Sequence, residues 1–387
     1  MNQPPLTGNY TILALLLSPH LENKIICQIR NTILKEQIIW VNLLKEASLQ
    51  RCGPLLYVRL KQHHLFNELP PAVQTLLQHA YNLNVERNTL FKNILIELLA
   101  ELSKENIDSL LLKGAATFCD DLYNDPGARV MGDIDLLVPL NKIDKCQRIL
   151  DTLGYYKIDN PDRELDGIAT DERHHHLLPH YHPGTSLPVE IHFKIAYAQA
   201  GRVLSTAQTW DRKISTTLGG YETSILNPQD RLILNTVHAL LPHREFIRGR
   251  IELLQLAEFA LMATEFATEI DWDSWLSLAK QHQLTSEFLT YLTLAHRLMN
   301  IPWPSAVPHS KIAQLHSKRI LNAETFQHST SSRKWHTSKL IRDGYYYANL
   351  PVWIWTNVCY APGLNNIPDR VQLLLKKLLS VHNWSKI

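Results

Sequence analysis

The chain has 387 residues, of which 45% are hydrophobic, so it can bury a large core and is expected to form two or three domains. Its 39 basic and 37 acidic residues leave a net charge of only +2, which excludes a field that would hold long nucleic acid nonspecifically. The five cysteines are scattered, odd in number and without CxxC spacing, which favours reduced thiols in the cytoplasm.

No segment has the pattern of a secretion signal or a membrane span. The apolar run from Tyr10 to Leu17 follows a start without basic residues and is too short for a signal peptide. No stretch approaches the roughly eighteen uninterrupted apolar residues of a membrane helix. We therefore expect a cytoplasmic protein without membrane contact.

The first part of the chain, residues 1–105, is predicted to be a helical domain. Its clearest helix runs over residues 85–105, where apolar side chains recur at helical spacing and form a wide stripe. Pro70-Pro71 interrupts the helical pattern upstream, so we expect a break between this helix and the preceding one.

A strand, a glycine turn and a helix are predicted next, at the start of a middle domain over residues 106–225. Residues 110–112 (LLL) are typical of a buried strand, 113–116 (KGAA) indicate a tight turn, and 117–123 favour the start of a helix. A glycine at a helix N-terminus leaves N–H groups and a positive dipole end near each other, and Lys113 adds a charge. Together these features predict a phosphate-binding element.

The most informative motif is the sequence GDID at residues 132–135, which is followed by an apolar run. Side chains alternate across a strand, so Asp133 and Asp135 share a face. At about 3.3 Å of rise per residue they lie roughly 6.6 Å apart, which suits oxygens that hold two divalent ions about 3.5–4 Å apart. The alternative is a solvent-facing strand whose acids only protect a sheet edge. The glycine turn upstream favours the metal site.

Further strands and one helix complete the middle domain. Asn141 is expected to cap a helix with Asp144 in its first turn. A strand is expected to follow Gly154, and a polar loop covers residues 160–172. A hairpin that turns at residues 183–185 is expected after this loop.

The second strand of this hairpin supplies another acid. In residues 187–195 the apolar side chains alternate with Glu190, His192 and Lys194, so these three share one face. Glu190 is the candidate for a third catalytic carboxylate. The alternative is an amphipathic hairpin strand with one wet face.

Histidines are concentrated in the same hairpin, at positions 174, 175, 176, 180, 182 and 192. Adjacent strand residues point to opposite faces, so of the His174–His176 run at most His174 and His176 are expected to act on one ligand. A zinc site is one interpretation. We favour stacking on a base, hydrogen bonding to phosphate, or plain surface positions.

The last part, residues 226–387, is predicted to be a C-terminal helical domain. Asn227 is the expected cap of a helix that starts at Pro228 and continues through Leu241. This helix carries His238, for which a half-buried structural role is the alternative to a functional one. The aromatic run at residues 351–355 is expected in a core, with a dimer surface as the alternative.

The middle domain resembles the bacterial "uncharacterised nucleotidyltransferase" family, a branch of the polymerase-beta-like nucleotidyltransferase superfamily. The segments that carry the resemblance are Lys113-Gly114, Tyr123, Asp125-Pro126-Gly127, Arg129, the run from Gly132 to Val138, and Glu190-Ile191-His192. The resemblance extends back into the helical N-terminal region and forward to His238 and the basic segment 243–250. Gln255 stands where the family tends to have an aspartate.

Two departures from the superfamily pattern are typical of this branch. Ala115 follows Gly114 where the superfamily has Gly or Ser, and seventeen residues lie between Ala115 and Asp133. Arg129 is the candidate that replaces the missing serine as a phosphate ligand. The resemblance implies that Asp133, Asp135 and Glu190 are catalytic and hold Mg²⁺ or Mn²⁺. The residues implied to bind the nucleotide are Lys113, Gly114, Ala115, Arg129, Gly132 and His192.

The implied fold is an α/β (α+β) nucleotidyltransferase core with a small mixed sheet, flanked by N- and C-terminal helical domains. The implied activity is transfer of NMP from an NTP, with ATP expected, to a hydroxyl of an unidentified small-molecule or peptide/protein acceptor. Two alternatives stay open: a nucleotide-binding regulator without turnover, and a toxin-antitoxin component that modifies tRNA or a partner protein. The sequence does not define the oligomeric state.

Overall fold

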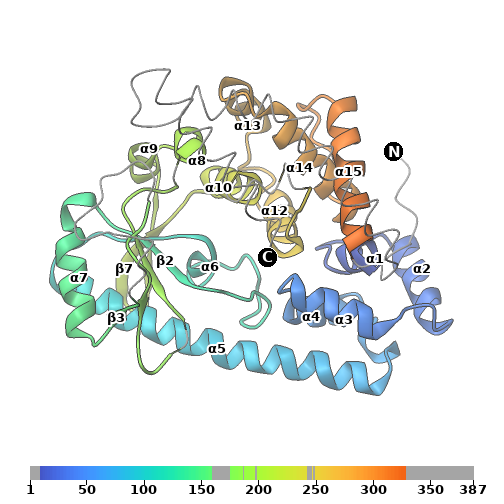
Figure 1. The fold of residues 1–387 in the computed structure, drawn as a ribbon, viewed down its shortest axis with the longest axis horizontal. Coiled ribbons are helices and arrows are strands. Elements are labelled where there is room, and N and C mark those ends of the chain that lie inside the picture. The colour runs from blue at the N-terminus through green and yellow to red at the C-terminus, as the bar shows by residue number, and fades with distance from the viewer. Residues whose placement is uncertain are drawn as a thin grey trace, which may run out of the picture.

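The computed structural model describes residues 9–158, 175–185, 187–196, 198–241, 246 and 249–327, which form one mixed sheet surrounded by helices (Figure 1). The α-helices are α1 (Asn9–Leu16), α2 (Asn23–Leu34), α3 (Trp40–Leu49), α4 (Gly53–Gln62), α5 (Pro71–Lys104), α6 (Lys113–Ala116), α7 (Ile143–Thr152), α8 (Ala198–Val203), α9 (Thr206–Asp211), α10 (Pro228–Leu240), α12 (Leu253–Glu265), α13 (Trp272–Gln281), α14 (Thr285–Leu298) and α15 (Lys311–Gln327). Short 3₁₀ turns occur at Phe66–Glu68 and Leu140–Lys142. The strands are β1 (Leu110–Leu111), β2 (Ile134–Leu137), β3 (Tyr156–Lys157), β4 (His180–Tyr181), β5 (Val189–His192), β6 (Ile214–Leu218) and β7 (Tyr221–Ile225).

The described strands form a sheet in the order β3-β4-β5-β2-β1-β7-β6, so β2 lies at its centre. β5 pairs with β2 in parallel, whereas β1 pairs with β2 antiparallel and with β7 in parallel. The remaining pairs are antiparallel. This mixed sheet with helical regions before and after it confirms the predicted fold class.

The long helix α5 connects the N-terminal helices to the sheet. It contacts α4 near one end and β7 and α7 near the other, and Figure 1 shows it running along one side of the molecule. The helix starts at Pro71, well before the predicted start at residue 85, because proline is accepted in the first turn of a helix. The break predicted at Pro70-Pro71 is therefore the beginning of this helix.

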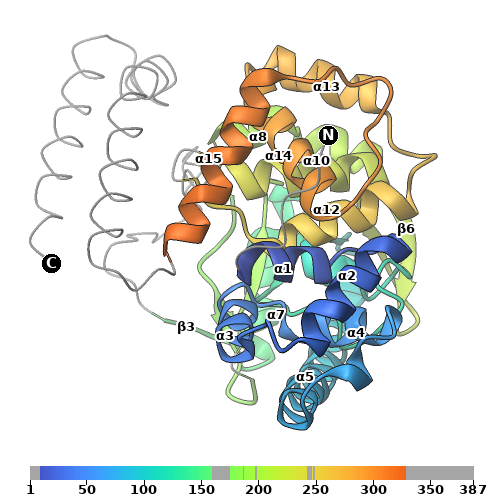
Figure 2. The same ribbon diagram turned by 90° about the vertical axis from the view of Figure 1, so that its right-hand side faces the viewer.

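Two hydrophobic clusters make up the described core. The larger one joins side chains of α1–α4 to side chains of α10–α15, and α1 lies beside α15 in both views (Figures 1 and 2). The second cluster lies between the sheet, α7 and the C-terminal half of α5. The helices before residue 105 and after residue 226 thus share a core. The domain boundaries at 105/106 and 225/226 stay predictions.

The helix expected over residues 117–123 is not formed. α6 is a single turn, Lys113–Ala116, and the chain from residue 117 to 133 is irregular. Short polar side chains bind nearby backbone groups there: Thr117 Oγ1 donates to the Gly114 carbonyl at 2.7 Å, and Asp125 Oδ1 accepts from the Gly127 N–H at 2.9 Å. Such bonds compete with helix formation, which explains the difference from the prediction.

Asn141 does not cap α7. The helix begins at Ile143 after the 3₁₀ turn at Leu140–Lys142, in which the Lys142 N–H donates to the Pro139 carbonyl at 2.8 Å. The turn places Asn141 before the cap position, while Asp144 lies in the first turn as predicted. By contrast, Asn227 caps α10 as predicted, since its side chain accepts from the Asp230 N–H.

Other predictions can be compared only in part. Cys27, Cys52, Cys119 and Cys146 are unpaired thiols, as expected, and Cys359 lies outside the described residues. None of the described helices has the length and apolar character needed to cross a membrane. The polar loop 160–172, His174, most of the basic segment 243–250 and the aromatic run 351–355 lie outside the described residues.

Candidate active site

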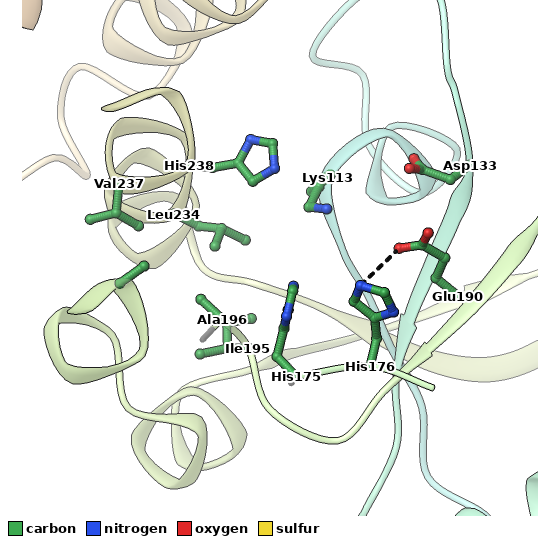
Figure 3. A pocket seen from close by; sticks show the side chains of 11 residues that line it. Lys113, Asp133, His175, His176, Glu190, Ile195, Ala196, Leu234, Val237 and His238 are labelled. Atoms are coloured by element: carbon green, nitrogen blue, oxygen red, sulfur yellow. Dashed lines mark ion pairs between the residues drawn. The ribbon is translucent and has the colours of Figure 1, made fainter. Parts of the chain in front are cut away.

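The parallel pairing of β2 with β5 places two of the predicted catalytic acids side by side. Asp135 lies directly opposite Glu190 in the register of these strands. Asp133 immediately precedes β2 and lines the same cavity as Glu190 (Figure 3). The fold therefore brings the three acids together although β2 and β5 are far apart in the sequence.

Asp135 is the most deeply buried of the three, at 1% exposure, and it is bound by two cationic or polar donors. Lys113 Nζ lies 2.9 Å and His192 Nε2 2.8 Å from the same oxygen, Asp135 Oδ1. Burial disfavours the charge, but Lys113 and His192 outweigh it and hold the pKa of Asp135 well below its usual range. Asp135 is therefore ionised, and His192 must donate its Nε2–H to it.

The pKa of Asp133 is shifted in the direction opposite to that of Asp135. Burial, and then the negative charge of Asp135, raise its pKa above the ordinary value. Lys113 lowers the pKa of Asp133, but its ammonium group is bonded to Asp135. Asp133 is thus a carboxyl group of raised pKa that lines a cavity next to an ionised acid, and such groups are candidates for functional roles.

Lys113 is held in an unusual backbone conformation. Its φ is +45°, in the left-handed region that non-glycine residues rarely adopt. Burial works against its charge, but Asp135 and Asp133 outweigh burial and raise the pKa of the ammonium group. Lys113 is therefore a fixed internal cation at the edge of the acid cluster.

Among the residues that the structure describes, the group of ligand atoms close enough for one ion differs from the predicted set by one residue. Asp135, Glu190 and His192 each place one ligand atom within 4.8 Å of the others. His192 is fully buried and donates its Nε2–H to Asp135, so this proton would have to leave before Nε2 could bind a metal. We assign it to hold the Asp135 carboxylate. Its burial leaves no access for the base stacking or surface role considered from the sequence.

A cavity of about 190 Å³ opens next to the acids and has two chemically distinct walls (Figure 3). The polar wall consists of Lys113, Asp133, Glu190, His175 and His176. The opposite wall consists of Ile195, Ala196, Ala200, Leu234 and Val237, with His238 beside them. A ligand in this cavity would meet carboxylates on one side and an apolar surface from the segment after β5, α8 and α10 on the other.

His238 is half-buried, and its ring is oriented by the residue that departs from the family pattern. Gln255 Nε2 lies 2.8 Å from His238 Nδ1. An amide nitrogen can only donate, so Nδ1 accepts and the neutral ring carries its proton on Nε2. The glutamine therefore fixes the tautomer of a histidine that lines the cavity.

The glycine motif is packed rather than open. A Cβ on Gly114 would lie 2.6 Å from Arg129 Nη1 and 2.7 Å from Met131 Cγ, so any other residue at this position would require these two side chains to shift. Ala115 is 1% exposed within the cluster next to the sheet. Gly132 is exposed, and Arg51 Nη1 lies 3.5 Å from where its Cβ would be.

Arg129 forms an ion pair with a residue that could not be predicted from the sequence. Its Nε lies 2.5 Å from Glu258 Oε2 on α12, and Tyr123 OH donates to the same oxygen at 3.1 Å. Both charged side chains are nearly buried, at 15% and 6% exposure. Arg129 would have to leave this ion pair to replace the missing serine as a phosphate ligand.

Two asparagines of α5 were also missed. Asn84 Nδ2 donates to the carbonyls of Gly127 and Arg129 at 2.8 and 3.0 Å, and Asn88 Nδ2 donates to those of Pro126 and Arg129 at 2.7 and 3.0 Å. They fix the irregular segment that leads to the DxD motif. Their only signal in the sequence is a polar pair, four residues apart, on the buried side of a helix.

Comparison with known proteins gives one weak structural likeness. The crystal structure of an antigenic nucleotidyltransferase-like protein from Paracoccidioides brasiliensis matches 57% of this chain and 96% of that one, at 16% identity and a TM-score of 0.32. No residue role is transferred at that score. No curated protein matches the chain.

The sequence itself matches a family. The model of the family described as "Uncharacterised nucleotidyltransferase" aligns with residues 36–300, which is more than half of the 387-residue chain. The match includes the long helix α5, the sheet with its three acids, and the helices that form the apolar wall of the cavity. The chain belongs to the uncharacterised nucleotidyltransferase family.

Proposed function

We propose that this protein is a metal-dependent nucleotidyltransferase that moves NMP from an NTP to a hydroxyl group of a small-molecule or peptide/protein acceptor and releases pyrophosphate. The observation that carries the proposal is the proximity of three acids: Asp133 and Glu190 line one cavity, and the buried Asp135 lies directly opposite Glu190 in the paired strands. Membership of a nucleotidyltransferase family supports the class of reaction.

The residues of the site fit divalent ions. Carboxylate oxygens are ligands that Mg²⁺ and Mn²⁺ prefer. Burial, and then the charge of Asp135, raise the pKa of Asp133, so a bound cation would favour its ionised form. Asp133, Asp135 and Glu190 would hold the ions. When bound, such ions screen the triphosphate charge and lower the pKa of the attacking hydroxyl.

The chemistry assigns a different task to each side chain. The acceptor oxygen forms a bond to the α-phosphorus while the bond to the bridging oxygen breaks, so negative charge moves to the leaving pyrophosphate. Glu190 faces the cavity and can take the hydroxyl proton. Lys113 keeps Asp135 ionised and adds positive charge near the phosphates, and His192 holds the Asp135 carboxylate in place.

The acceptor we propose is compact. The cavity of about 190 Å³ lies next to Glu190, and its apolar wall suits a ring or an aliphatic segment beside the reacting hydroxyl. The net charge of +2 does not favour a polynucleotide. A small molecule or an exposed peptide side chain meets both conditions.

The test is a calorimetric titration of Mg·ATP, and then of the other NTPs, into the wild-type protein and an Asp133→Asn/Asp135→Asn variant. These substitutions keep the shape of the side chains and remove their charge. A matched control, Asp144→Ala/Asp151→Ala, removes two exposed acids from α7. We expect metal-dependent binding in the wild type and the control and its loss in the site variant, with circular dichroism as a check of folding.

Other outcomes separate the alternatives. Binding without pyrophosphate release for any acceptor tested with labelled nucleotide would favour the regulator without turnover. Failure of the folded wild-type protein to bind any NTP would refute the proposal. Modification of tRNA in the same labelling assay would favour the toxin-antitoxin alternative.

A further inference from the structure

His176 lies on the polar wall of the cavity beside Glu190, and the proposed mechanism gives it no task (Figure 3). Its backbone is fixed to β5, because it forms an antiparallel bridge with His192 and the neighbouring Leu177 N–H donates to the Ile191 carbonyl at 2.9 Å. The side chain is 13% exposed. His176 is therefore a positioned imidazole and not part of a loose surface loop.

The tautomer of this imidazole follows from its hydrogen bond. His176 Nδ1 lies 2.6 Å from the carbonyl oxygen of Leu177. A carbonyl can only accept, so Nδ1 carries the proton, and Nε2 of the neutral ring has a lone pair. A backbone carbonyl bound to one ring nitrogen is the usual way in which proteins orient a histidine that binds metal through the other.

Nε2 is directed at a carboxylate. His176 Nε2 and Glu190 Oε2 are 3.7 Å apart (Figure 3). This is longer than the roughly 2.7–3.2 Å of a direct N–H···O hydrogen bond. Two ligands with bonds of about 2.1 Å to one ion lie about 3.0 Å apart at octahedral angles and about 3.4 Å apart at tetrahedral angles. The observed gap is longer than either spacing, by about 0.7 Å for octahedral and about 0.3 Å for tetrahedral angles, so a shared ion would draw the two side chains together.

We propose that His176 Nε2 and the Glu190 carboxylate bind one divalent first-row transition ion, so that the site takes Mn²⁺ in preference to Mg²⁺. The inference deepens the proposed function, because it assumes that the ion held by Glu190 is one of those used in nucleotidyl transfer. It places a nitrogen ligand beside Glu190, in addition to the Asp135, Glu190 and His192 group described above.

The preference follows from ligand chemistry. Mg²⁺ takes oxygen ligands and keeps several waters, whereas imidazole nitrogen strengthens the binding of transition ions. Mn²⁺ accepts carboxylates as readily as Mg²⁺ does and gains the additional bond to nitrogen. His175 packs edge-on against His176, with ring centroids 4.5 Å apart, and limits rotation of the ligand ring.

The variant that isolates Nε2 is His176→Asn. The asparagine amide can reproduce the hydrogen bond of Nδ1 to the Leu177 carbonyl and has no atom at the position of Nε2. The control is His79→Asn, which removes an exposed imidazole from α5 by the same substitution. Thermal unfolding of each variant shows whether it is folded.

The first readout is electron spin-echo modulation of the Mn²⁺-loaded protein without nucleotide, which detects ¹⁴N coordinated to Mn²⁺. We expect nitrogen coupling in the wild type and in the His79 variant and its absence in His176→Asn. The second readout is affinity: His176→Asn should weaken Mn²⁺ binding by at least about tenfold and change Mg²⁺ binding by less than about twofold.

Two results would overturn the proposal: no nitrogen coupling in the wild type, or coupling that persists in His176→Asn. If the coupling disappears only in a His192→Asn variant, the ligand is His192 and the assignment to His176 is wrong. Failure of the His176 proposal can be distinguished from failure of the proposed function. The wild type can bind Mg·ATP, and the Asp133→Asn/Asp135→Asn variant can lose this binding, even if no nitrogen atom binds the metal. Nitrogen coupling can likewise persist in a protein that binds no NTP.

Discussion

The ion pair between Arg129 and Glu258 offers a direct test of how the C-terminal helices support the site. It joins α12 to the segment that leads into the DxD strand, and it is nearly buried on both sides. Glu258→Leu removes the carboxylate and leaves the Arg129 guanidinium and the Tyr123 hydroxyl without this partner. We therefore expect a large loss of stability.

The magnitude follows from the burial. Removal of one partner from a buried ion pair costs about 3–5 kcal/mol, because the remaining charge stays desolvated. Urea unfolding followed by far-UV circular dichroism measures this loss. Glu265→Leu on the same helix is the control, since Glu265 is exposed at 46% of its side chain, and we expect a change within about 0.5 kcal/mol.

A double variant separates the effect of losing the ion pair from the effect of leaving the buried Arg129 charge unpaired. Arg129→Met/Glu258→Leu should recover most of the stability lost in Glu258→Leu, because apolar side chains of similar volume replace a buried pair at little cost. A loss below about 1 kcal/mol in Glu258→Leu would show that the pair is solvated and would refute the reasoning. If Arg129 binds the triphosphate instead, Arg129→Met would weaken Mg·ATP binding with little change in stability.

Two further predictions concern packing and pH. Gly114→Ala should lower the unfolding free energy by about 1–3 kcal/mol in the same urea assay, since the new Cβ would overlap the Arg129 and Met131 side chains. The control is Gly53→Ala, whose Cβ would have nothing within 4 Å, and it should be neutral or stabilising. Equal effects of the two substitutions would contradict the close approach at Gly114. The protein should lose stability as the pH falls below about 6.5, because His175 cannot easily take up a proton in the folded state. Burial, and then the charges of neighbouring histidines, lower the pKa of His175 to about 2. The unfolded state then binds a proton that the folded state does not, so stability rises with pH in this window by up to about 1.4 kcal/mol per pH unit. His175→Phe should flatten this slope, and an unchanged slope would contradict a neutral buried ring.

Much of the fold could be predicted because its signals are local. The cap at Asn227, the apolar β1 and the strand that carries Glu190 each depend on neighbouring residues, and the structure has them where they were expected. The polar face expected for this strand is only partly formed, because His192 is fully buried. The convergence of Asp135 and Glu190 could be anticipated only from the resemblance, since no periodicity reports which strands pair.

The parts of the site that were missed depend on partners far away in the sequence. Asn84 binds carbonyl groups more than forty residues later, and Glu258 binds Arg129 across 129 residues. A polar residue on the buried side of a helix shows that a partner exists but not which one. His176 was assigned to a strand face from alternation alone. The cavity beside Glu190 became visible only when the His175–His176 segment, β5, α8 and α10 were placed together.

The position after Gly114 is suited to alanine in this chain. Ala115 is 1% exposed and belongs to the same hydrophobic cluster as Met131 next to the sheet, so a serine hydroxyl there would be buried and would need a new partner. Gly114 itself is covered by Arg129 and Met131, and Arg129 is held by Glu258. The glycine motif therefore serves packing, and Lys113 is its member that reaches the acid cluster. We infer that in this protein the nucleotide phosphates are bound chiefly by Lys113 and the metal ions, so Lys113→Met should weaken Mg·ATP binding more than Ala115→Ser does.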